Sequence, residues 1–502
     1  MLPIDFLYRT ARHSPGAVAV DAPSGCTTYA DLRDRVDALA AALQAMDPRP
    51  GSRIGICAHN TPEHLTALLA TLAAGKVWVP LNPREGRAEL TAKLEATAPS
   101  IVLLDDDCLD QVDIPDGIQR IIGAGGHGGG GMEHLIAAGT GRRPVRVERH
   151  PDEVQAIKFT GGSSGRPKGV LQPCRAWVAG AVSMMHGWGM GPRDGYLVAA
   201  PLTHGTSCYV VPTLAAGGRL VFMNGKTSAG GVLDALASRH VTMTFVPPTL
   251  IYAMLGELGG RRFEAPGLRH MIYGAAPMPP AKVREALDTF GPVVGTNYGQ
   301  TEAPQVVTLM TARDYAEGGG LASAGRPSLL ARVEVMDPDG RILPPGEQGE
   351  IVVRGDMTML GYLDMPDATA ETLRDGWLHT GDVGLFDERG YLTLRDRLRD
   401  VVITGGFNVY PSDVEAVLTR HPDVREAVVF GMPDEKWGEA VHAAVLLKTG
   451  STISAPEIIA FVKTELDGVK APKRIHLLET MPRNPVGKVV RREVRDFVAL
   501  RG

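Results

Sequence analysis

The sequence predicts an α/β protein: a large N-terminal domain of layered α/β subdomains plus a β-rich subdomain, followed by a small α+β C-terminal domain. Its length of 502 residues exceeds what a single hydrophobic core usually serves. Between residues 195 and 300, short apolar runs alternate with helical stretches, which is typical of buried strands covered by helices. After residue 330 the runs become strand-like and are separated by turns, which indicates a β-rich part.

Local patterns predict the individual elements. Thr28 and Asp31 form a capping-box pattern, and apolar residues at helical spacing from Leu32 to Leu43 predict an amphipathic helix. Apolar runs predict strands at residues 196–200, 219–223, 241–246, 270–273 and 293–297, then at 332–336, 349–353 and 390–394, and finally at 427–431 and 443–447. The charged stretch 395–400 marks the predicted boundary of the C-terminal domain, although a solvated surface turn has the same composition.

Composition narrows the class of partner. The chain carries 52 Lys and Arg against 57 Asp and Glu, a formal net charge of -5, so we expect a small-molecule partner and no nucleic acid. The sequence has no apolar run of about 18 residues and no basic, apolar leader, which predicts no transmembrane segment. The five scattered cysteines form no CxxC pair, so neither disulfides nor zinc are expected and a cytoplasmic location fits.

Glycine makes up 60 of the 502 residues, and its densest segment is 123–131. Gly123, Gly125 and Gly128 there form a GxGxxG pattern behind an apolar pair, as in a dinucleotide-binding site. The helical run that follows, 132–138, is short for a βαβ unit. We therefore interpret the segment as a flexible loop and keep a nicotinamide-dependent oxidoreductase as the rival hypothesis.

A second glycine-rich segment, residues 159–170, combines glycines, hydroxyls and a lysine between two apolar runs. Glycine lets backbone N–H groups approach an oxyanion, the hydroxyls donate further hydrogen bonds, and Lys168 adds a positive charge. Lys168 precedes the strand-like run 169–171 instead of a helix, so the segment is not a Walker A loop. It predicts a phosphate-binding loop between two strands of a hairpin, although a surface turn has the same composition.

Five segments resemble, in order, the motifs of the adenylate-forming superfamily, which includes acyl-CoA synthetases, amino-acid adenylation domains and firefly-type luciferases. They are the loop 159–170 and residues 298–302, 381–382, 396–400 and 482–488. The resemblance spans residues 28–488, with Gly161 where the superfamily usually has serine. It implies the fold of this superfamily: an ATP- and acyl-binding domain over 1–396, a hinge at 397–400, and a mobile domain over 401–502 that carries the catalytic lysine.

The resemblance also implies which residues bind ATP and Mg2+. Thr301 would hold the α-phosphate, and Glu302 would bind Mg2+ through carboxylate oxygens, the ligands that this ion prefers. The residues implied for the β- and γ-phosphates are Thr160, Gly161, Gly162, Ser163, Ser164, Gly165 and Lys168. Those implied for adenine and ribose are Gly274, Ala275, Ala276, Pro277, Tyr298, Gly299, Asp382 and Arg397. Without the motifs, Glu302 would be an ordinary surface acid, Tyr298 a core tyrosine and Asp382 a turn residue.

A two-step reaction follows from the resemblance. A carboxylate attacks the α-phosphorus of ATP to give acyl-AMP and pyrophosphate, with Lys488 bridging the two reacting groups. After the C-terminal domain rotates about Arg399, the thiol of coenzyme A takes the acyl group and AMP leaves. Gly405 and Gly406 would line the channel for the pantetheine arm, since absent side chains allow close approach.

The implied acyl pocket includes His204, which matches the gate histidine of the superfamily, together with Ser207, Thr249 and Gly274. Gly205 stands where amino-acid adenylation domains usually have an aspartate for the substrate ammonium, which disfavours an α-amino acid. Small and apolar surroundings favour an apolar carboxylic acid, and fatty, aryl and alicyclic acids all stay open.

Other hypotheses stay open at this point. The acyl group could pass to a carrier-protein thiol or an amine, or the adenylate could undergo a luciferase-like oxidation. A noncatalytic nucleotide-binding protein of this fold is disfavoured, because Lys488, Glu302 and the phosphate loop occur together. The sequence does not decide the oligomeric state, and a homo-oligomer is compatible with it.

Overall fold

The computed structural model describes residues 1–123, 131–160, 167–223, 227–238, 240–304, 306–405, 407–466, 468–483 and 489–500. By their contacts, the residues form two compact units: Met1–Val333 with Val352–Thr380, and Glu334–Ile351 with Gly381–Gly502. The β-rich residues 334–351 and 381–396 thus group with the second unit, whereas the sequence predicts one N-terminal domain over 1–396. The predicted hinge at 397–400 concerns motion and stays a prediction.

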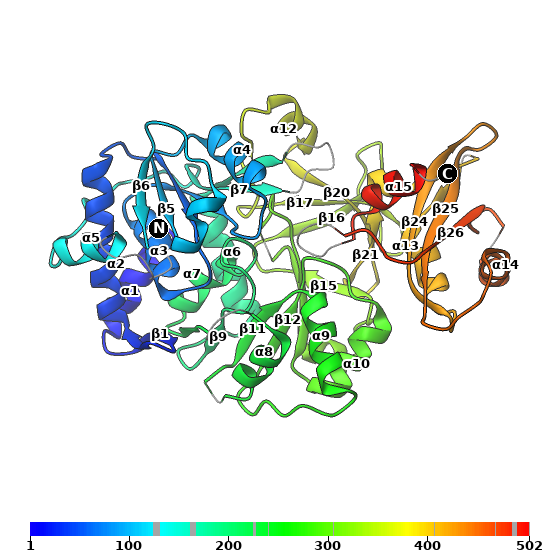
Figure 1. The fold of residues 1–502 in the computed structure, drawn as a ribbon, viewed down its shortest axis with the longest axis horizontal. Helices are drawn as coiled ribbons and strands as arrows, with labels where there is room; N and C mark the ends of the chain where they lie inside the picture. The colour runs from blue at the N-terminus through cyan, green and yellow to red at the C-terminus, as the bar shows by residue number, and fades with distance from the viewer. Residues whose placement is uncertain are drawn as a thin grey trace. The chain divides into compact units, whose positions relative to one another are not determined.

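The first unit contains two sheets (Figure 1). One has seven strands in the order β6 (Gln119–Ile122), β5 (Ile101–Leu104), β3 (Arg53–Cys57), β4 (Val77–Leu81), β7 (Val154–Thr160), β8 (Lys168–Pro173) and β18 (Gly361–Tyr362). The strands from β6 to β7 are parallel, whereas β8 returns antiparallel to β7. The predicted hairpin is therefore confirmed, with Thr160 opposite Lys168.

The other sheet of this unit has a parallel centre and antiparallel edges. Its strands, in spatial order, are β2 (Gly25–Thr28), β1 (Val18–Ala22), β10 (Arg219–Val221), β9 (Gly195–Leu197), β11 (Met243–Val246), β12 (His270–Tyr273), β13 (Val294–Tyr298), β14 (Thr308–Met310) and β15 (Ser323–Pro327). The strands from β1 to β13 are parallel, and β2, β14 and β15 are antiparallel to their neighbours. All five strands predicted between residues 195 and 300 are present, which confirms the α/β layering.

Helices separate and cover the two sheets. The central layer comprises α1 (Asp5–His13), α2 (Tyr29–Met46), α3 (Pro62–Ala73), α6 (Cys174–Trp188) and α7 (Ser207–Ala215). On the outer faces lie α4 (Arg87–Thr97) against the seven-stranded sheet, and α8 (Ala229–Leu236), α9 (Pro248–Leu258) and α10 (Pro280–Phe290) against the other sheet. The shorter helices are α5 (Met132–Ala138), which packs on α2, α11 (Ala312–Ala316) and α12 (Pro366–Thr372).

Alternating side chains explain this layering. Along β3, Ile54 and Ile56 pack into the central core, whereas Cys57 packs into the outer core, because successive residues of a strand face opposite sides. The helix predicted after Thr28 is α2, and the capping box between Thr28 and Asp31 is confirmed at its start. The sequence therefore predicts both the strands and the helix that separates them correctly.

The second unit combines a group of strands with an α+β domain. β16 (Arg332–Met336), β17 (Gly349–Arg354), β20 (Trp377–Phe386) and β21 (Leu392–Arg397) lie side by side in that order, and the chain passes between the units within the first three. Later residues form a sheet of β22 (Val402–Thr404), β23 (Phe407–Val409), β24 (Val424–Asp434), β25 (Gly438–Leu447) and β26 (Arg474–Leu478). One face packs on α13 (Pro411–Leu418) and α14 (Ala455–Glu465), and the other on α15 (Arg491–Ala499). The predicted α+β architecture is confirmed.

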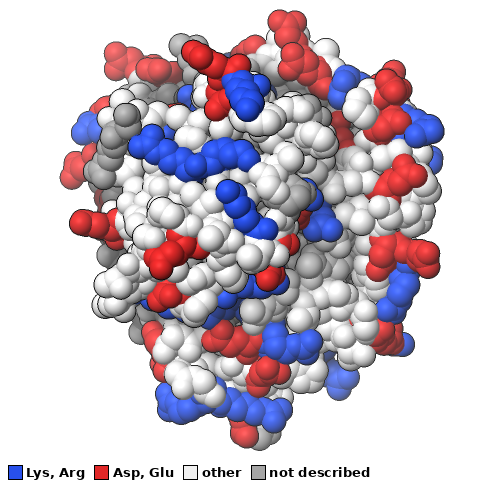
Figure 2. Space-filling view, turned by 90° about the vertical axis from the view of Figure 1, so that its right-hand side faces the viewer, with Lys and Arg blue, Asp and Glu red and all other residues white. Residues whose placement is uncertain are grey.

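Surface charge is mixed on one face of the molecule. On the face drawn in Figure 2, basic and acidic side chains occur together, with uncharged surface between them. This mixture agrees with the small formal net charge of -5. None of the helices within the described ranges has the length and apolar composition needed to cross a membrane.

Candidate active site

Two predicted site loops follow the carboxyl ends of neighbouring strands. β12 and β13 are parallel, with Tyr273 opposite Thr296. Residues 274–277 follow β12, and residues 299–302 follow β13, which ends with the buried Tyr298. Both loops therefore leave the same edge of the sheet, the edge where open α/β sheets usually bind ligands.

Lys168, Tyr362 and Glu302 form a chain of contacts. Lys168 begins β8, and its ammonium nitrogen lies 4.7 Å from the centre of the Tyr362 ring. The Tyr362 hydroxyl donates a 2.8 Å hydrogen bond to Oε1 of Glu302. Tyr362 lies there because β18 pairs with β8, which sets it opposite Val170. Tyr362 thus contacts both a cation of the predicted phosphate loop and a carboxylate of the next motif.

Gln172 and a backbone hydrogen bond hold the loop 299–302. The amide of Gln172, which is buried on β8, donates to the carbonyl oxygen of Thr301 at 2.8 Å and accepts from the Trp177 indole at 3.1 Å. The backbone N–H of Met359 donates to the carbonyl oxygen of Glu302 at 2.8 Å. Thr301 and Glu302 are therefore held in place from two sides.

The predicted adenine wall begins with a glycine that packing requires. A Cβ atom at Gly274 would lie 2.7 Å from Oδ1 of Asn297 and 2.9 Å from the Phe245 ring. Asn297 in turn donates to the Tyr209 hydroxyl at 3.0 Å. Ala275 has a left-handed backbone, φ 67°, and is exposed, so the loop turns toward solvent directly after Gly274. The buried neighbours therefore require glycine at position 274, independently of any ligand that the loop contacts.

His204 lies in the turn between β9 and α7 and is an exposed residue. Its Nδ1 lies 3.0 Å from the hydroxyl oxygen of Thr203, which is buried. Partial desolvation, followed by the positive charges of Lys158, Lys93 and Arg84, lowers the pKa of His204. Both effects favour the neutral imidazole over the charged form.

The other two predicted acyl-pocket residues, Ser207 and Thr249, lie on different helices. Ser207 begins α7, is fully buried, and donates from its hydroxyl to the carbonyl oxygen of His204 at 2.7 Å. Thr249 lies in the first turn of α9 and is exposed. Ser207 therefore contacts the turn that carries His204 directly.

In the second unit the structure joins Asp382 and Arg397. The two residues are opposite each other on β20 and β21, and Nε of Arg397 lies 2.8 Å from Oδ1 of Asp382. Gly381 before them has φ 67°, a conformation that favours glycine. Arg399 lies in the short turn Leu398–Asp400 that follows β21. The two residues predicted for ribose therefore form an ion pair.

Gly405 follows β22 and packs against Trp437. Its backbone has φ 56°, and its N–H donates to the carbonyl oxygen of Trp437 at 2.8 Å. A Cβ atom at Gly405 would lie 2.8 Å from the Trp437 ring. Packing inside the second unit already requires glycine at this position.

The remaining predicted residues lie outside the described residues. They are Gly161, Gly162, Ser163, Ser164, Gly165, Gly406 and Lys488. The middle of the glycine-dense segment, 124–130, lies outside them as well. It is flanked by the edge strand β6 and by α5, which has only 7 residues.

Comparison with known proteins decides the family. The model of the AMP-binding enzymes matches residues 7–363, and that of the AMP-binding enzyme C-terminal domain matches residues 413–488. The chain belongs to the AMP-binding enzyme family. A feruloyl-CoA synthase of Amycolatopsis sp is 36% identical over 495 residues, which cover 97% of each chain. The fatty acid–[acyl-carrier-protein] ligase ScoC of Streptomyces coeruleorubidus is 33% identical and covers 97% of this chain and 94% of its own. The structure of the amide bond synthetase McbA from Marinactinospora thermotolerans is 33% identical, with a TM-score of 0.86 and 99% of both chains covered.

Membership in the AMP-binding enzyme family confirms the resemblance and the fold that the motifs predict. The protein is an AMP-forming acid–thiol ligase, and its relatives differ in the acid that they activate. The rival hypothesis of a nicotinamide-dependent oxidoreductase is wrong, because the family match includes the glycine-dense segment 123–131. The hypothesis of a noncatalytic protein is not supported either, because relatives that match 93–98% of this chain are named as CoA ligases or synthases.

Three residues of this AMP-binding enzyme contact the candidate site although no motif includes them: Tyr362, Gln172 and Lys158. Tyr362 lies 60 residues from Glu302 in the chain, so only the pairing of β18 with β8 brings them together. Lys158 offers one visible signal, because a lysine interrupts an otherwise apolar stretch of β7. The site therefore extends beyond the motifs.

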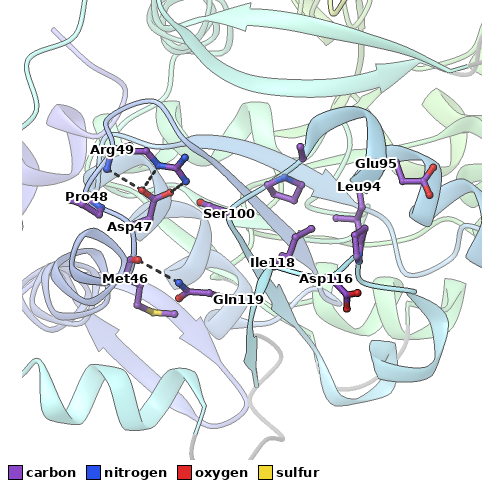
Figure 3. Close-up of a pocket in the computed structure, with 14 residues that line it drawn as sticks. Met46, Asp47, Pro48, Arg49, Leu94, Glu95, Ser100, Asp116, Ile118 and Gln119 are labelled. Atoms are coloured by element: carbon purple, nitrogen blue, oxygen red, sulfur yellow. Dashed lines mark hydrogen bonds and ion pairs between the residues drawn. The ribbon is translucent and has the colours of Figure 1, made fainter.

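A cavity of about 690 Å3 opens elsewhere, at the amino ends of β3, β5 and β6 (Figure 3). On its wall, Arg49 donates to both carboxylate oxygens of Asp47 at 2.9 Å. Among the described lining residues, none belongs to the predicted site. Because the strands are parallel, this edge is opposite to the end of β7 at Thr160, so the cavity is separate from the candidate active site.

Proposed function

We propose that this enzyme is an ATP-dependent acyl-CoA synthetase that acts on an apolar carboxylic acid. In the first step a carboxylate oxygen of the acid bonds to the α-phosphorus of ATP, and the bond to pyrophosphate breaks. In the second step the sulfur of coenzyme A bonds to the acyl carbon, and the bond to AMP breaks. The thiol proton passes to solvent.

The contact chain from Lys168 through Tyr362 to Glu302 supports this proposal most strongly. It sets a cation suited to phosphate oxygens beside a carboxylate suited to Mg2+. Glu302 accepts the Tyr362 hydrogen bond on one oxygen and is only partly buried, which fits a carboxylate that shares its lone pairs with a hard cation. Bound Mg2+ would neutralise charge on the phosphates. In this proposal Lys168 and Thr160 bind the β- and γ-phosphates, and Thr301 binds the α-phosphate.

The remaining roles are proposed on the family motifs. Tyr298 and residues 274–277 would enclose adenine, and the Asp382 carboxylate would accept hydrogen bonds from the ribose hydroxyls beside Arg397. Lys488 would bridge the substrate carboxylate and the α-phosphate, and residues 397–400 with Arg399 would form the hinge of a mobile domain over 401–502. Gly405 and Gly406 would line the pantetheine channel. His204, Ser207, Thr249 and Gly274 would border the acyl group.

The acceptor of the acyl group differs among the relatives. The relatives' names include a CoA synthase, an acyl-carrier-protein ligase and an amide bond synthetase. We favour coenzyme A because the feruloyl-CoA synthase is 36% identical to this chain, against 33% for the acyl-carrier-protein ligase and for the amide bond synthetase. A carrier protein or an amine would use the same acyl-AMP, so the acceptor requires its own test.

The test has two parts. ATP–pyrophosphate exchange is measured with fatty, aryl and alicyclic acids, ferulic acid included, and AMP release is then measured with coenzyme A, a phosphopantetheinylated carrier protein or an amine. We expect exchange with at least one apolar acid, followed by acyl-CoA formation. Exchange with transfer only to the carrier or the amine would replace coenzyme A as the acceptor. An absence of exchange with every acid would overturn the proposal.

Tyr362→Phe is expected to raise the Mg2+ concentration needed for half-maximal pyrophosphate exchange by about 10- to 100-fold, the usual effect of losing a partner that orients a metal ligand. The ring that contacts Lys168 remains, but the hydroxyl that orients Glu302 is lost. The matched control is Tyr8→Phe, because the Tyr8 hydroxyl donates to the Asp37 carboxylate at 2.6 Å between α1 and α2. Equal Mg2+ dependence in the two variants would contradict the proposed role of Tyr362.

A further inference from the structure

Lys158 carries an ammonium group into the central layer of the first unit. Along β7, Ala156 packs into the central core and Ile157 into the outer core, so Lys158 faces the same side as Ala156. It is only 7% exposed, and burial lowers the pKa of its ammonium group. An apolar side chain suits such a position, because a buried charge is costly unless a partner compensates it.

Within the described ranges, no carboxylate pairs with this ammonium group. Its nitrogen lies 2.6 Å from Oγ of Ser207, 3.4 Å from the carbonyl oxygen of His204, and 5.1 and 5.5 Å from the ring centres of Trp78 and Trp177. The residues of the first unit outside the description include neither Asp nor Glu. The charge is therefore held by a hydroxyl, a carbonyl dipole and two aromatic faces.

These contacts fasten the turn that carries His204. The Ser207 hydroxyl donates to the carbonyl oxygen of His204 at 2.7 Å, which leaves its lone pairs for Lys158. At the other end of the turn, the Asn60 side-chain nitrogen donates to the carbonyl oxygen of Ala200 at 2.9 Å, and its Oδ1 accepts from the N–H of Leu202 at 2.8 Å. An amide holds one end of the turn and an ammonium group the other.

We propose that Lys158 is a positioning residue for His204. It fastens the end of the turn 201–207, and its charge favours a neutral imidazole. The charged groups whose electrostatic effect reaches this imidazole are Lys158 on β7, Lys93 and Glu89 on α4, and Arg84 before α4, so three cations oppose one carboxylate. That the imidazole borders the acyl group rests on the proposed function, whereas the fastening and the charge effect do not.

Lys158→Met tests both effects, since methionine keeps an unbranched apolar side chain but removes the charge and the donors. We expect the KM for the acid to rise about tenfold, as for one lost hydrogen bond to a buried group, with the KM for ATP unchanged. We also expect an NMR titration of the His204 ring to show a higher pKa than in the wild type. A rise in both readouts supports the proposal.

Lys76→Met is the matched control. Lys76 is another buried lysine of the first unit, and it donates to the carbonyl oxygen of Arg49 and to Oγ of Ser52, remote from His204 in the fold. It should lower stability without changing the KM for the acid or the titration of His204. The same changes in Lys76→Met as in Lys158→Met would overturn the proposal, because they would then reflect only the loss of a buried lysine.

Ser207→Ala separates the two effects, because it removes the hydroxyl link and keeps the charge. We expect a higher KM for the acid and a nearly unchanged pKa of His204. A wild-type KM for the acid in Ser207→Ala would overturn the fastening, even if Lys158→Met does not fold. A wild-type titration of His204 in Lys158→Met would overturn the charge effect. This titration needs no substrate, so it stays decisive if no acid proves to be activated and the proposed function fails.

Discussion

Lys488→Ala is expected to slow acyl-AMP formation about 100- to 1000-fold, the usual effect of losing one preorganised charge contact to a transition state. Thioester formation from supplied acyl-AMP should stay near the wild-type rate. The reason is that the proposed lysine neutralises charge only while the carboxylate bonds to the α-phosphorus. Pyrophosphate exchange reports the first step, and single-turnover formation of acyl-CoA from synthetic acyl-AMP reports the second.

The control for this variant is Lys473→Ala in the same unit. Lys473 is exposed, and its ammonium group donates to the carbonyl oxygen of Gly468. Both half-reactions of this control should match the wild type. Equal losses in the two half-reactions of Lys488→Ala would contradict a role confined to adenylation, and with it the proposed rotation of the C-terminal domain.

Arg491→Met is expected to lower the free energy of unfolding of the second unit by about 3 kcal/mol, the lower end of the range for breaking a buried ion pair. Arg491 on α15 binds three carboxylates: Nη1 lies 3.2 Å from Asp396 and 3.0 Å from Asp400, and Nη2 lies 2.9 Å from Glu415. The Arg491 side chain is 20% exposed and that of Asp396 only 4%, so the variant leaves acids with little access to water. Amide hydrogen exchange in β24 and β25, which belong to the second unit, measures the loss.

The effect of Arg491→Met should depend on pH in a defined direction. Burial raises the pKa of Asp396 and Glu415, so the folded state keeps protons at a pH where the unfolded chain has lost them, and stability falls as pH rises through that window. Removal of the Arg491 charge raises these pKa values further. The destabilisation should therefore be larger near pH 8 than near pH 5, because protonated acids do not need the arginine.

Arg495→Met is the control on the same helix. Arg495 is 45% exposed and pairs with the adjacent, exposed Asp496, an arrangement worth about 0–1 kcal/mol. It should unfold like the wild type at both pH values. If Arg491→Met lost the same stability at both pH values, the carboxylates would not be the cause, and the loss would reflect packing of α15 alone.

The parts of the fold that the sequence predicts correctly are those with local causes. The strands between residues 195 and 300 follow from apolar runs, and the α2 start follows from the hydrogen bonds between Thr28 and Asp31. The hairpin of β7 and β8 follows because Lys168 begins a strand instead of a helix. Each of these patterns lies in or next to the strand, helix or hairpin that it predicts.

The parts of the site that the sequence does not predict depend on contacts between distant residues. Tyr362 contacts Lys168 and Glu302 only because the two-residue strand β18 pairs with β8. The glycine at 274 depends on Asn297 and Phe245, which belong to neighbouring strands. The compact units likewise follow tertiary contacts, which place residues 334–351 with a part of the chain that begins at residue 381.

The chain passes between the two units inside β16, β17 and β20, so a single cut in the sequence does not separate them. This matters when a segment of one relative is exchanged for that of another. A segment swapped at residue 400 carries Arg491 and Asp413 from the donor but leaves Asp396 and Arg395, their ion-pair partners, in the recipient. A chimera joined at residue 400 therefore inherits two halves of one electrostatic network from different parents. Compatibility of the four residues, more than overall identity, should decide which chimeras fold.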